Sequence, residues 1–483
     1  MKKPIAFFDL DGTVRDTFQY RYPRAHQVTL FPGVPERLAA LRGRGYHLVG
    51  ITNQGGVANQ IVTREEVEAA NGRTQELLQD ARLDLILYCP HYQTADGFVC
   101  DCKKPAVGMV LDALSKLDSA TLDGSFVVGD SVPADKRLAE TLDLPFIHAE
   151  EFRAWSIEQI LRTVARKPKP AESITEDRPT GCLVGLAVAD ALGAQVEFWP
   201  RSRVRQMYPN GLREMRKSGL WKAGEFTDDT DMALLLAKSL LIHGELNAGD
   251  IAKRFSKWSH NAKDVGNQVR RVTSMIGYGE NPEECARQDY RNHPNNAAGN
   301  GAVMRCAPVA IFRSESVPML LADSRRSARI THGDPKAQSS CVLVNMAILH
   351  MMQGGDKQSP WQHGMKFLTP LERESWARLP EIASLHEEEI SSGGYTVNTV
   401  EAAFWSFVHS NSFEEAVERA ACLGDDADTV AAVTGALAGA YYGYASIPQR
   451  WIKSLVDEER IRKTALRLHR AGRVSTDTKG EAQ

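Results

Sequence analysis

Three carboxylates and two hydroxyl groups lie within residues 227–231, directly before an apolar run at residues 232–242. Acids packed this closely at the start of a predicted helix repel one another unless cations or backbone donors hold them, although each cluster alone could simply cap its helix. A second cluster, at residues 425–429, precedes the apolar stretch 430–444. Asp and Thr oxygens suit hard cations such as Mg²⁺, Mn²⁺ or Ca²⁺ better than zinc. Two such helix starts facing each other would form a site for one or two cations.

These clusters, together with two further segments, resemble the ADP-ribosylglycohydrolase family. The further segments are residues 181–197, GCLVGLAVADALGAQVE, and residues 299–305, GNGAVMR. All the motifs occur in the family's order, and the resemblance extends over about residues 178–450. It implies an all-helical fold with a binuclear metal centre in a cleft. It also implies hydrolysis that removes ADP-ribose, as family members do from dinitrogenase reductase, arginine and serine.

The same resemblance implies metal ligands at individual positions. The ligands of two Mg²⁺ or Mn²⁺ ions would be Thr227, Asp228, Asp229, Asp426, Asp428 and Thr429. We leave Asp425 out of this set, because the spacing makes Asp426 and Asp428 the pair on a common side.

The resemblance also implies residues that act on or bind the substrate. Glu197 corresponds to a mobile acidic residue, and it is a candidate general acid or base for cleavage through an oxocarbenium-like state. His332 is a further candidate for substrate contact, although a histidine after an apolar helix is more often structural. The loop around the ADP-ribose phosphates or the proximal ribose would consist of Gly299, Asn300, Gly301 and Ala302.

In residues 1–160, short apolar runs alternate with segments of helical periodicity. The apolar runs include residues 5–8, 47–51, 85–88 and 125–128. Strands separated by helices predict an α/β fold with a doubly wound parallel sheet. Ligands of such sheets bind at the carboxyl ends of the strands. The polar residues that follow each run are therefore the candidates for chemistry.

Four polar motifs follow these runs in order and together resemble the haloacid dehalogenase superfamily of phosphatases. They are Asp9-Leu-Asp11-Gly-Thr, Thr52-Asn53-Gln54, Lys103-Lys104-Pro105 and Gly129-Asp130. The resemblance implies that Asp9 attacks phosphorus to form an aspartyl-phosphate and that Asp11 is the general acid and base.

The resemblance assigns the remaining roles in this half as well. Thr52, Asn53 and Lys104 would hold the phosphoryl group, and Mg²⁺ would lie between Asp9, the Asp11 backbone carbonyl and Asp130, with Asp135 secondary. The sequence contains no large insertion that predicts a cap domain over the phosphatase pocket. We therefore expect the pocket to admit bulky substrates.

A cysteine-rich segment, residues 89–105, resembles the zinc loop of the histidinol-phosphate and heptose-bisphosphate phosphatase branch. Three thiols and one imidazole would bind Zn²⁺ in a closed tetrahedral site, which is normally structural. The predicted zinc ligands are Cys89, His91, Cys100 and Cys102.

The two halves predict separate domains. We expect a phosphatase domain at residues 1–162, a Pro-rich and charged linker at 163–179, an all-α domain at 180–470 and a polar tail at 471–483.

Composition indicates an ordinary globular protein, with 43% hydrophobic residues, 25% charged residues and a net charge of −3. This charge gives no global steering toward nucleic acid. The apolar run after the positively charged N-terminus is too short for a signal peptide. The composition of residues 430–447 predicts a buried helix rather than a membrane span. We therefore expect a cytoplasmic protein without membrane contact.

The sequence predicts a bifunctional hydrolase and leaves three interpretations of its substrates open. Both halves could act in turn on ADP-ribosylated phosphate ends of nucleic acid. Alternatively, a metabolic phosphatase for sugar or nucleotide phosphates is fused to a hydrolase of small or protein-linked ADP-ribose. In the third interpretation one half binds ADP-ribose without turnover. The phosphate ester, the group that carries ADP-ribose and the oligomeric state are not specified by the sequence.

Overall fold

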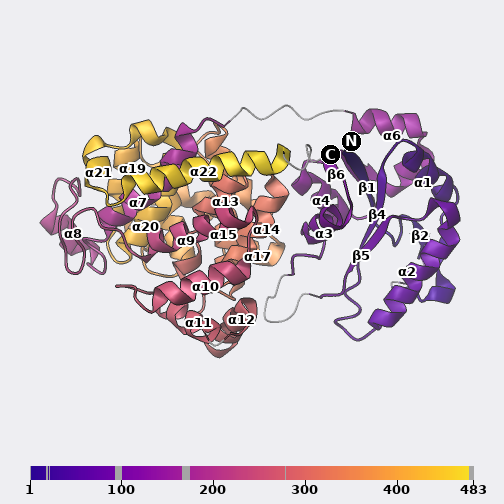
Figure 1. Cartoon of the computed structure of the whole chain (residues 1–483), viewed down its shortest axis with the longest axis horizontal. Coiled ribbons are helices and arrows are strands. Elements are labelled where there is room, and N and C mark those ends of the chain that lie inside the picture. The colour runs from indigo at the N-terminus through magenta and orange to yellow at the C-terminus, as the bar shows by residue number, and fades with distance from the viewer. Residues whose placement is uncertain are drawn as a thin grey trace. The chain divides into compact units, whose positions relative to one another are not determined.

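The computed structural model describes residues 2–17, 20, 22–92, 100–165, 174–277 and 279–477. The chain divides into two compact units, residues 1–170 and residues 171–478, which are described separately (Figure 1).

The first unit contains a five-stranded parallel sheet with strand order β5-β4-β1-β6-β7. Its strands are β1 (Lys3–Phe8), β4 (His47–Asn53), β5 (Leu85–Cys89), β6 (Ala120–Gly129) and β7 (Phe146–His148). The short strands β2 (Arg15–Asp16) and β3 (Thr29–Leu30) form a separate antiparallel pair. The helices are α1 (Val34–Gly43), α2 (Arg64–Leu78), α3 (Gly108–Lys116), α4 (Arg137–Leu142), α5 (Ala149–Ala154) and α6 (Ile157–Val164). The predicted α/β fold is confirmed.

The central strands are continuous apolar runs because helices cover both faces of the sheet. Residues 5–8 of β1 and 126–128 of β6 are fully buried. Strand β1 lies between β4 and β6, so the direction of the strand order reverses beside it. Ligands of open parallel sheets bind outside the carboxyl ends at such a point.

The second unit is helical, and no β-strand occurs among its described residues. Its helices are α7 (Asp177–Gly193), α8 (Arg201–Met207), α9 (Asp228–His243), α10 (Ala248–Ser259), α11 (Asn267–Gly277), α12 (Pro282–Asn292), α13 (Ala307–Phe312), α14 (Val317–Arg329), α15 (Pro335–Met352), α16 (Gln362–Met365), α17 (Pro370–Glu374), α18 (Thr396–Val408), α19 (Phe413–Ala421), α20 (Ala427–Tyr442), α21 (Gln449–Ser454) and α22 (Glu458–Asp477). The predicted all-α fold of this half is confirmed.

Helices α7 and α20 pack against each other along a row of glycines at the centre of this unit. A Cβ atom on Gly185 would lie 2.5 Å from the Gly435 carbonyl oxygen, so larger residues would push the two backbones apart. Residues 427–440 of α20 are buried. The small, weakly polar residues of this stretch therefore form a core helix, as the sequence predicts.

Three helices extend beyond the predicted domain boundaries. Helix α6 ends at Val164 and α7 begins at Asp177, so both enter the predicted linker, of which residues 166–173 lie outside the described residues. Helix α22 continues to Asp477, into the segment predicted as a polar tail.

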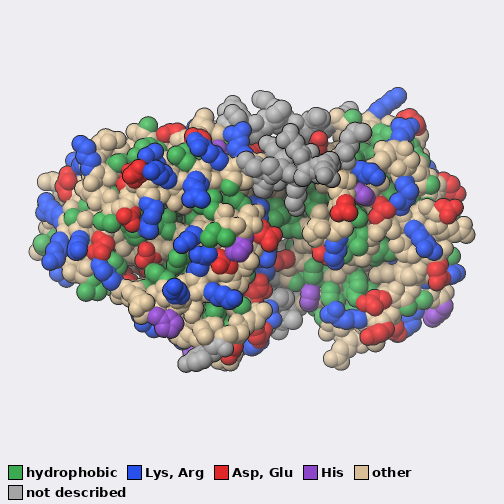
Figure 2. All heavy atoms as spheres, in the orientation of Figure 1, with side chains coloured by type: hydrophobic (Ala, Val, Ile, Leu, Met, Phe, Trp, Pro, Cys, Tyr) green, Lys and Arg blue, Asp and Glu red, His purple; other side chains and the backbone are tan. Residues whose placement is uncertain are grey.

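On the face drawn in Figure 2, neither sign of charge dominates. Basic and acidic side chains are interspersed on the face drawn in Figure 2. In the described parts of the chain, no helix combines the length and the apolar character that a membrane span requires.

Candidate active sites

Three acids of the first unit converge at the carboxyl ends of β1 and β6. One carboxylate oxygen each from Asp9, Asp130 and Asp135 lies within 4.8 Å of the others. The Lys104 Nζ atom donates to Asp9 and to Asp135 at 2.6 Å each, and to the carbonyl oxygen of Ile51 at 2.8 Å. Three carboxylates and one ammonium leave two negative charges, which suits a divalent cation.

Burial and charge act in opposite directions on this cluster. Burial alone would lower the pKa of Lys104, but the Asp9 and Asp135 carboxylates outweigh burial and raise it. Burial raises the pKa of Asp9 to about 8, against the lowering effect of Lys104. Lys104 is therefore held as a cation beside the proposed nucleophile, where it can offset phosphoryl charge.

Asp11 is held by three neighbours rather than by the acid cluster. Arg15 donates to both its oxygens, at 2.7 and 3.0 Å, while Gln54 Nε2 and Thr52 Oγ1 donate to Oδ2 at 2.7 and 3.1 Å. Asn53 exchanges hydrogen bonds with the backbone of Lys104, at 2.8 and 3.1 Å. Thr52 thus lies beside the candidate general acid, and Asn53 fixes the Lys104 loop.

Gly12 has a steric reason to be glycine. Its φ of +83° is unfavourable for other residues, and a Cβ atom there would collide with the Asp130 carboxylate. The turn after β1 therefore leaves the space that Asp130 occupies.

The predicted zinc ligands lie together at the end of β5. Donor atoms of Cys89, His91, Cys100 and Cys102 all lie within 4.8 Å of one another. The Cys89 and Cys100 Sγ atoms are 3.4 Å apart, and His91 Nδ1 is 3.2 Å from Cys102 Sγ. Three sulfurs and one imidazole nitrogen at these distances fit a structural Zn²⁺ site. Residues 93–99 of this loop lie outside the described residues.

In the second unit, Asp190 of α7 fixes the start of α9. Its carboxylate accepts hydrogen bonds from the backbone N–H of Thr227 and of Thr230, at 3.0 Å each, and from Thr230 Oγ1 at 2.5 Å. Asp190 is fully buried. Asp190 was not among the predicted site residues, although it lies within segment 181–197.

The two predicted metal-binding helix starts meet in space. Asp229 Oδ2 accepts hydrogen bonds from Thr227 Oγ1 at 3.2 Å and from Thr429 Oγ1 at 3.3 Å. Asp229 Oδ1 and Asp428 Oδ1 are buried and have no hydrogen-bond partner among the described residues. Unpaired buried oxygens are costly unless a cation binds them, so this donor set fits a centre of hard metal ions.

This cluster has no internal cation comparable to Lys104. No ion pair joins a described lysine or arginine to Asp228, Asp229, Asp426 or Asp428. Burial, reinforced by neighbouring acids, raises the pKa of Asp228 to about 8 and that of Asp229 and Asp428 well above the usual range.

Glu197 faces the same acids. Burial raises its pKa to about 8, with further contributions from Asp264, Asp426 and Asp228. A raised pKa is suited to a carboxyl group that gives and takes a proton near neutral pH. Asp264, in the loop between α10 and α11, was not selected from the sequence.

The glycine loop reaches the acids through Asn300. Its Nδ2 atom donates to Asp426 Oδ2 and to Thr399 Oγ1, at 2.9 Å each. Asp425, in contrast, is exposed and has a φ of 54°. Its backbone accepts a hydrogen bond from the N–H of Phe198 and donates one to the carbonyl oxygen of Trp199, next to Glu197.

His332 lies beneath the glycine loop. Its Nδ1 is 2.8 Å from Thr331 Oγ1, and a Cβ atom on Gly301 would come within 3.1 Å of the imidazole. Burial, together with Arg305 and Arg271, lowers the pKa of His332. The neutral imidazole supports the loop, and its contact with substrate stays a prediction.

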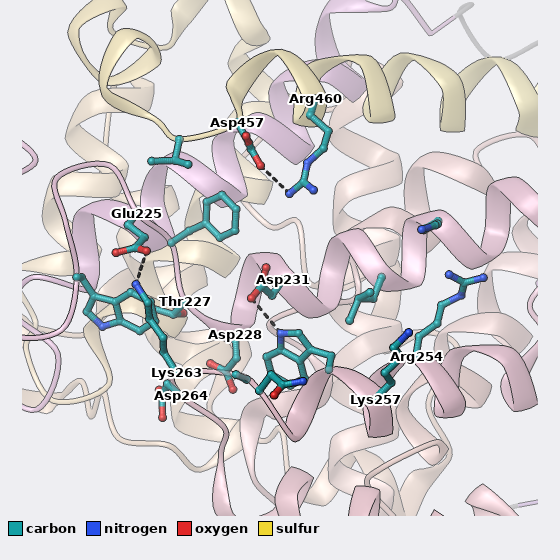
Figure 3. A pocket seen from close by; sticks show the side chains of 18 residues that line it. Glu225, Thr227, Asp228, Asp231, Arg254, Lys257, Lys263, Asp264, Asp457 and Arg460 are labelled. Carbon is teal, nitrogen blue, oxygen red and sulfur yellow. Dashed lines mark hydrogen bonds and ion pairs between the residues drawn. The ribbon is translucent and has the colours of Figure 1, made fainter. Parts of the chain in front are cut away.

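A cavity of about 620 Å³ borders the acid cluster at Thr227, Asp228 and Asp264 (Figure 3). Helices α9 and α10 and the start of α22 contribute to its walls. Its lining residues are Trp221, Glu225, Phe226, Thr227, Asp228, Asp231, Leu235, Lys238, Arg254, Lys257, Trp258, Asn261, Ala262, Lys263, Asp264, Val456, Asp457 and Arg460.

Comparisons with known proteins agree with this division. Residues 171–478 match the family model for ADP-ribosylglycohydrolase, and residues 4–153 match that for polynucleotide kinase 3 phosphatase. The ADP-ribosylarginine hydrolase Tri1 of Serratia proteamaculans (strain 568) is 34% identical over 308 residues, which are 62% of this chain and 80% of that protein.

Two further likenesses involve the same unit. The ADP-ribosyl-[dinitrogen reductase] glycohydrolase of Rhodospirillum rubrum is 34% identical over 291 residues, covering 58% of this chain and 90% of that protein. The solved structure of an ADP-ribosylglycohydrolase-related protein complex has 34% identity and a TM-score of 0.52, covering 62% of this chain and 98% of that one.

These matches confirm the predicted fusion of a phosphatase-like half with a helical hydrolase half, and both halves indicate hydrolase activity. The match over residues 171–478 extends over more than half of the chain. The chain therefore belongs to the ADP-ribosylglycohydrolase family and carries a phosphatase-like unit before its glycohydrolase unit.

Proposed function

We propose that the first unit is a Mg²⁺-dependent phosphomonoesterase and the second a metal-dependent ADP-ribosyl hydrolase, and that they act in sequence on ADP-ribosylated phosphate ends of nucleic acid. The observation that carries the hydrolase assignment is the pair of unpartnered buried oxygens on Asp229 and Asp428. Eight cysteines without a disulfide fit a reducing compartment such as the cytoplasm.

In the phosphatase reaction, an Asp9 oxygen attacks phosphorus and the bond from phosphorus to the ester oxygen breaks. Asp11 gives its proton to the departing oxygen and then takes a proton from the water that hydrolyses the aspartyl-phosphate. Lys104, held 2.6 Å from Asp9, offsets the phosphoryl charge. Asp9, Asp130 and the Asp11 carbonyl would hold Mg²⁺, which supplies further positive charge in the transition state.

In the hydrolase reaction, the bond from the anomeric carbon of the terminal ribose to the acceptor breaks through an oxocarbenium-like state. Glu197 assists departure of the acceptor and deprotonates water, which its raised pKa favours. Two Mg²⁺ or Mn²⁺ ions would be held by the oxygens of the two helix starts, and they would fix the ribose hydroxyls. Asn300 and the glycine loop bind the ADP moiety on the Asp426 side.

The chemistry of the linkage sets the order of the two steps. A terminal phosphate that carries ADP-ribose through the anomeric carbon is a diester, which a phosphomonoesterase does not accept. Removal of ADP-ribose leaves a monoester that Asp9 can attack. The match of residues 4–153 to polynucleotide kinase 3 phosphatase supports a polynucleotide as the carrier.

An oligonucleotide with an ADP-ribosylated terminal phosphate tests this function. We expect the wild-type protein to release ADP-ribose first and then phosphate, which leaves a hydroxyl end. Asp9→Asn should stop at the phosphate end, and Asp228→Ala should release neither product. Release of ADP-ribose without loss of phosphate by the wild-type protein would contradict the proposed sequence.

A second candidate substrate is ADP-ribose linked to arginine, because the relatives that resemble this chain include ADP-ribosylarginine hydrolases. In that case the phosphatase acts on an unrelated small phosphate ester. Faster hydrolysis of ADP-ribosylarginine than of the modified oligonucleotide would favour this candidate. In the phosphatase assay, the oligonucleotide should then fail to compete with small phosphate esters.

A further inference from the structure

The metal-site acids are approached from two sides. On one side Asn300 of the glycine loop contacts Asp426. On the other, the cavity of about 620 Å³ reaches Thr227, Asp228 and Asp264 and includes no residue of the glycine loop. If the ADP moiety occupies the glycine-loop side, as proposed above, the cavity is left for the acceptor from which ADP-ribose is removed.

Several of the charged residues in this cavity are already paired. Lys263 pairs with Glu225, and Arg460 Nη2 lies 3.0 Å from Asp457 Oδ2 (Figure 3). Arg254 pairs with Asp250, which lies outside the lining of the cavity. These pairs neutralise most of the charge on the walls.

Two lysines in the cavity remain uncompensated. Lys238 of α9 and Lys257 of α10 are exposed and form no hydrogen bond or ion pair with any residue that the structure describes. Divalent cations on Asp228 and its neighbours would neutralise the acidic end. The loaded cavity would then carry a small net positive charge, because the two lysines outnumber the one remaining lining carboxylate without a cationic partner, Asp231.

The lysines lie along helix faces that lead away from the metal site. Asp231, Leu235 and Lys238 follow helical spacing on α9, and Arg254, Lys257 and Trp258 do so on α10. Ten residues separate Asp228 from Lys238, which is about 15 Å along a helix. This length suits an extended, repeating anion better than a single phosphate group.

Two tryptophan side chains lie among these cations in the lining of the cavity. Trp258 is fixed by a hydrogen bond from its Nε1 to Asp231 Oδ2 at 3.0 Å, and Lys263 Nζ lies 5.3 Å from the ring centre of Trp221. Positive grooves lined with aromatic rings are typical of sites for single-stranded nucleic acid, where phosphates pair with cations and bases stack on the rings.

We propose that this cavity is the acceptor subsite of the hydrolase and that it takes a single nucleic-acid strand. Lys238 and Lys257 contact phosphodiester groups, and Trp221 offers its ring to a base. This inference rests on the proposed function, since it names the surface that holds the strand whose end carries ADP-ribose.

Direct binding tests the inference without requiring turnover. The probe is a fluorescein-labelled single-stranded DNA of ten nucleotides with hydroxyl ends, titrated with the full chain in Mg²⁺ and followed by anisotropy. We expect the double variant Lys238→Gln/Lys257→Gln to weaken binding at least tenfold. Its slope of log affinity against log salt should fall by about 1.4, the value for two lost phosphate contacts on a single strand.

The matched control is Lys253→Gln, an exposed lysine of α10 that does not line the cavity. It should change the affinity less than twofold. Equal affinity of the wild-type protein and the double variant would overturn the inference, as would an equal loss in Lys253→Gln. Polyglutamate that displaces the strand at equal charge concentration would point to an acidic protein as acceptor and would also overturn it.

Failure of this inference is distinguishable from failure of the proposed function. The binding assay depends on the lysines and needs no hydrolysis. The proposed function instead fails if the wild-type protein releases no ADP-ribose, or if Asp228→Ala releases it at the wild-type rate.

Discussion

The two acidic sites of this chain are built on opposite electrostatic plans. In the phosphatase unit, Lys104 lies between Asp9 and Asp135 and compensates part of their charge from within. In the hydrolase unit, Asp229 and Asp428 retain unpartnered buried oxygens, and no described lysine or arginine pairs with them. The first site is therefore partly neutral before any ion binds, whereas the second depends on bound cations for its electrostatic balance.

We expect the largest effect from substitutions that abolish one activity and leave the other unchanged. Asp9→Asn should lower phosphatase kcat by at least about 10³-fold, because an amide oxygen is a poor nucleophile, and leave ADP-ribose release unchanged. Asp228→Ala should do the reverse. Initial rates on a phosphomonoester and on an ADP-ribosyl substrate check both. Loss of both activities in either variant would contradict the independence of the sites.

Removal of the internal cation should destabilise the phosphatase unit. Lys104→Met leaves Asp9 and Asp135 buried without their partner, at a cost of about 3–5 kcal/mol in unfolding free energy. Hydrogen exchange of β1 and β6 during urea titration measures this cost. Lys103→Met is the matched control, since Lys103 is only half-buried and lies over the Tyr92 ring. A similar loss in both variants would contradict the role assigned to Lys104.

The hydrolase unit should show the steeper pH dependence when metals are removed. Burial raises the pKa of Asp228 and of Glu197 to about 8, so the folded state holds protons that the unfolded chain releases near pH 4. The contribution of these two groups to stability is then fully present below about pH 4 and is lost as the pH rises toward 8, by at most about 1.4 kcal/mol per pH unit for each such proton.

Unfolding followed by tryptophan fluorescence in EDTA measures this dependence, because seven of the eight tryptophans belong to the second unit. Saturating Mg²⁺ should stabilise the ionised acids and flatten or reverse the slope. A metal-free protein whose stability rises between pH 5 and pH 8 would contradict the assigned shifts.

The smallest expected effect distinguishes two adjacent acids. Asp425→Asn should change ADP-ribose release less than twofold, because Asp425 is exposed and asparagine tolerates its φ of 54°. Asp426→Asn should lower the same rate at least tenfold, since Asp426 lies with Asn300 at the predicted metal centre. Kinetics at saturating Mg²⁺ compare the two, and equal effects would contradict the exclusion of Asp425.

Sequence reasoning predicted the fold class of each half because both signals are local. Continuous apolar runs such as β1 and the helical periods of α9 and α20 require no knowledge of distant residues. Helices α12, α14 and α22 are among those that the sequence patterns did not predict. Helix α12 is mostly polar. Helix α14 buries Asp323, whose Oδ2 accepts a hydrogen bond from Arg313 Nε at 2.7 Å. Because a charged residue lies on its buried face, the sequence of α14 does not separate a surface face from a core face.

The site residues also divide into those that local sequence motifs predict and those whose roles depend on tertiary contacts. The predicted ligands belong to compact motifs whose members lie within a few residues of one another. The roles of Asp190 and Asp264 depend on which side chains the fold brings opposite them, and in the sequence Asp190 is an isolated acid in an apolar helix. Asp135 was expected to be secondary, and its contact with Lys104 is likewise visible only in the structure. Their contacts with α9, Glu197 and Lys104 exist only in the tertiary structure.

The contact of Thr429 with Asp229 joins residues 200 positions apart, and it has a consequence for synthesis on the ribosome. The phosphatase acids and Lys104 all precede residue 136, so that pocket can assemble while the hydrolase is still being translated. At about 5–20 residues per second, the ribosome needs roughly another 15–60 s to reach Thr429. A nascent chain released after residue 231 but before Thr429 would carry the phosphatase acids and only one of the two helix starts at the predicted metal centre of the hydrolase.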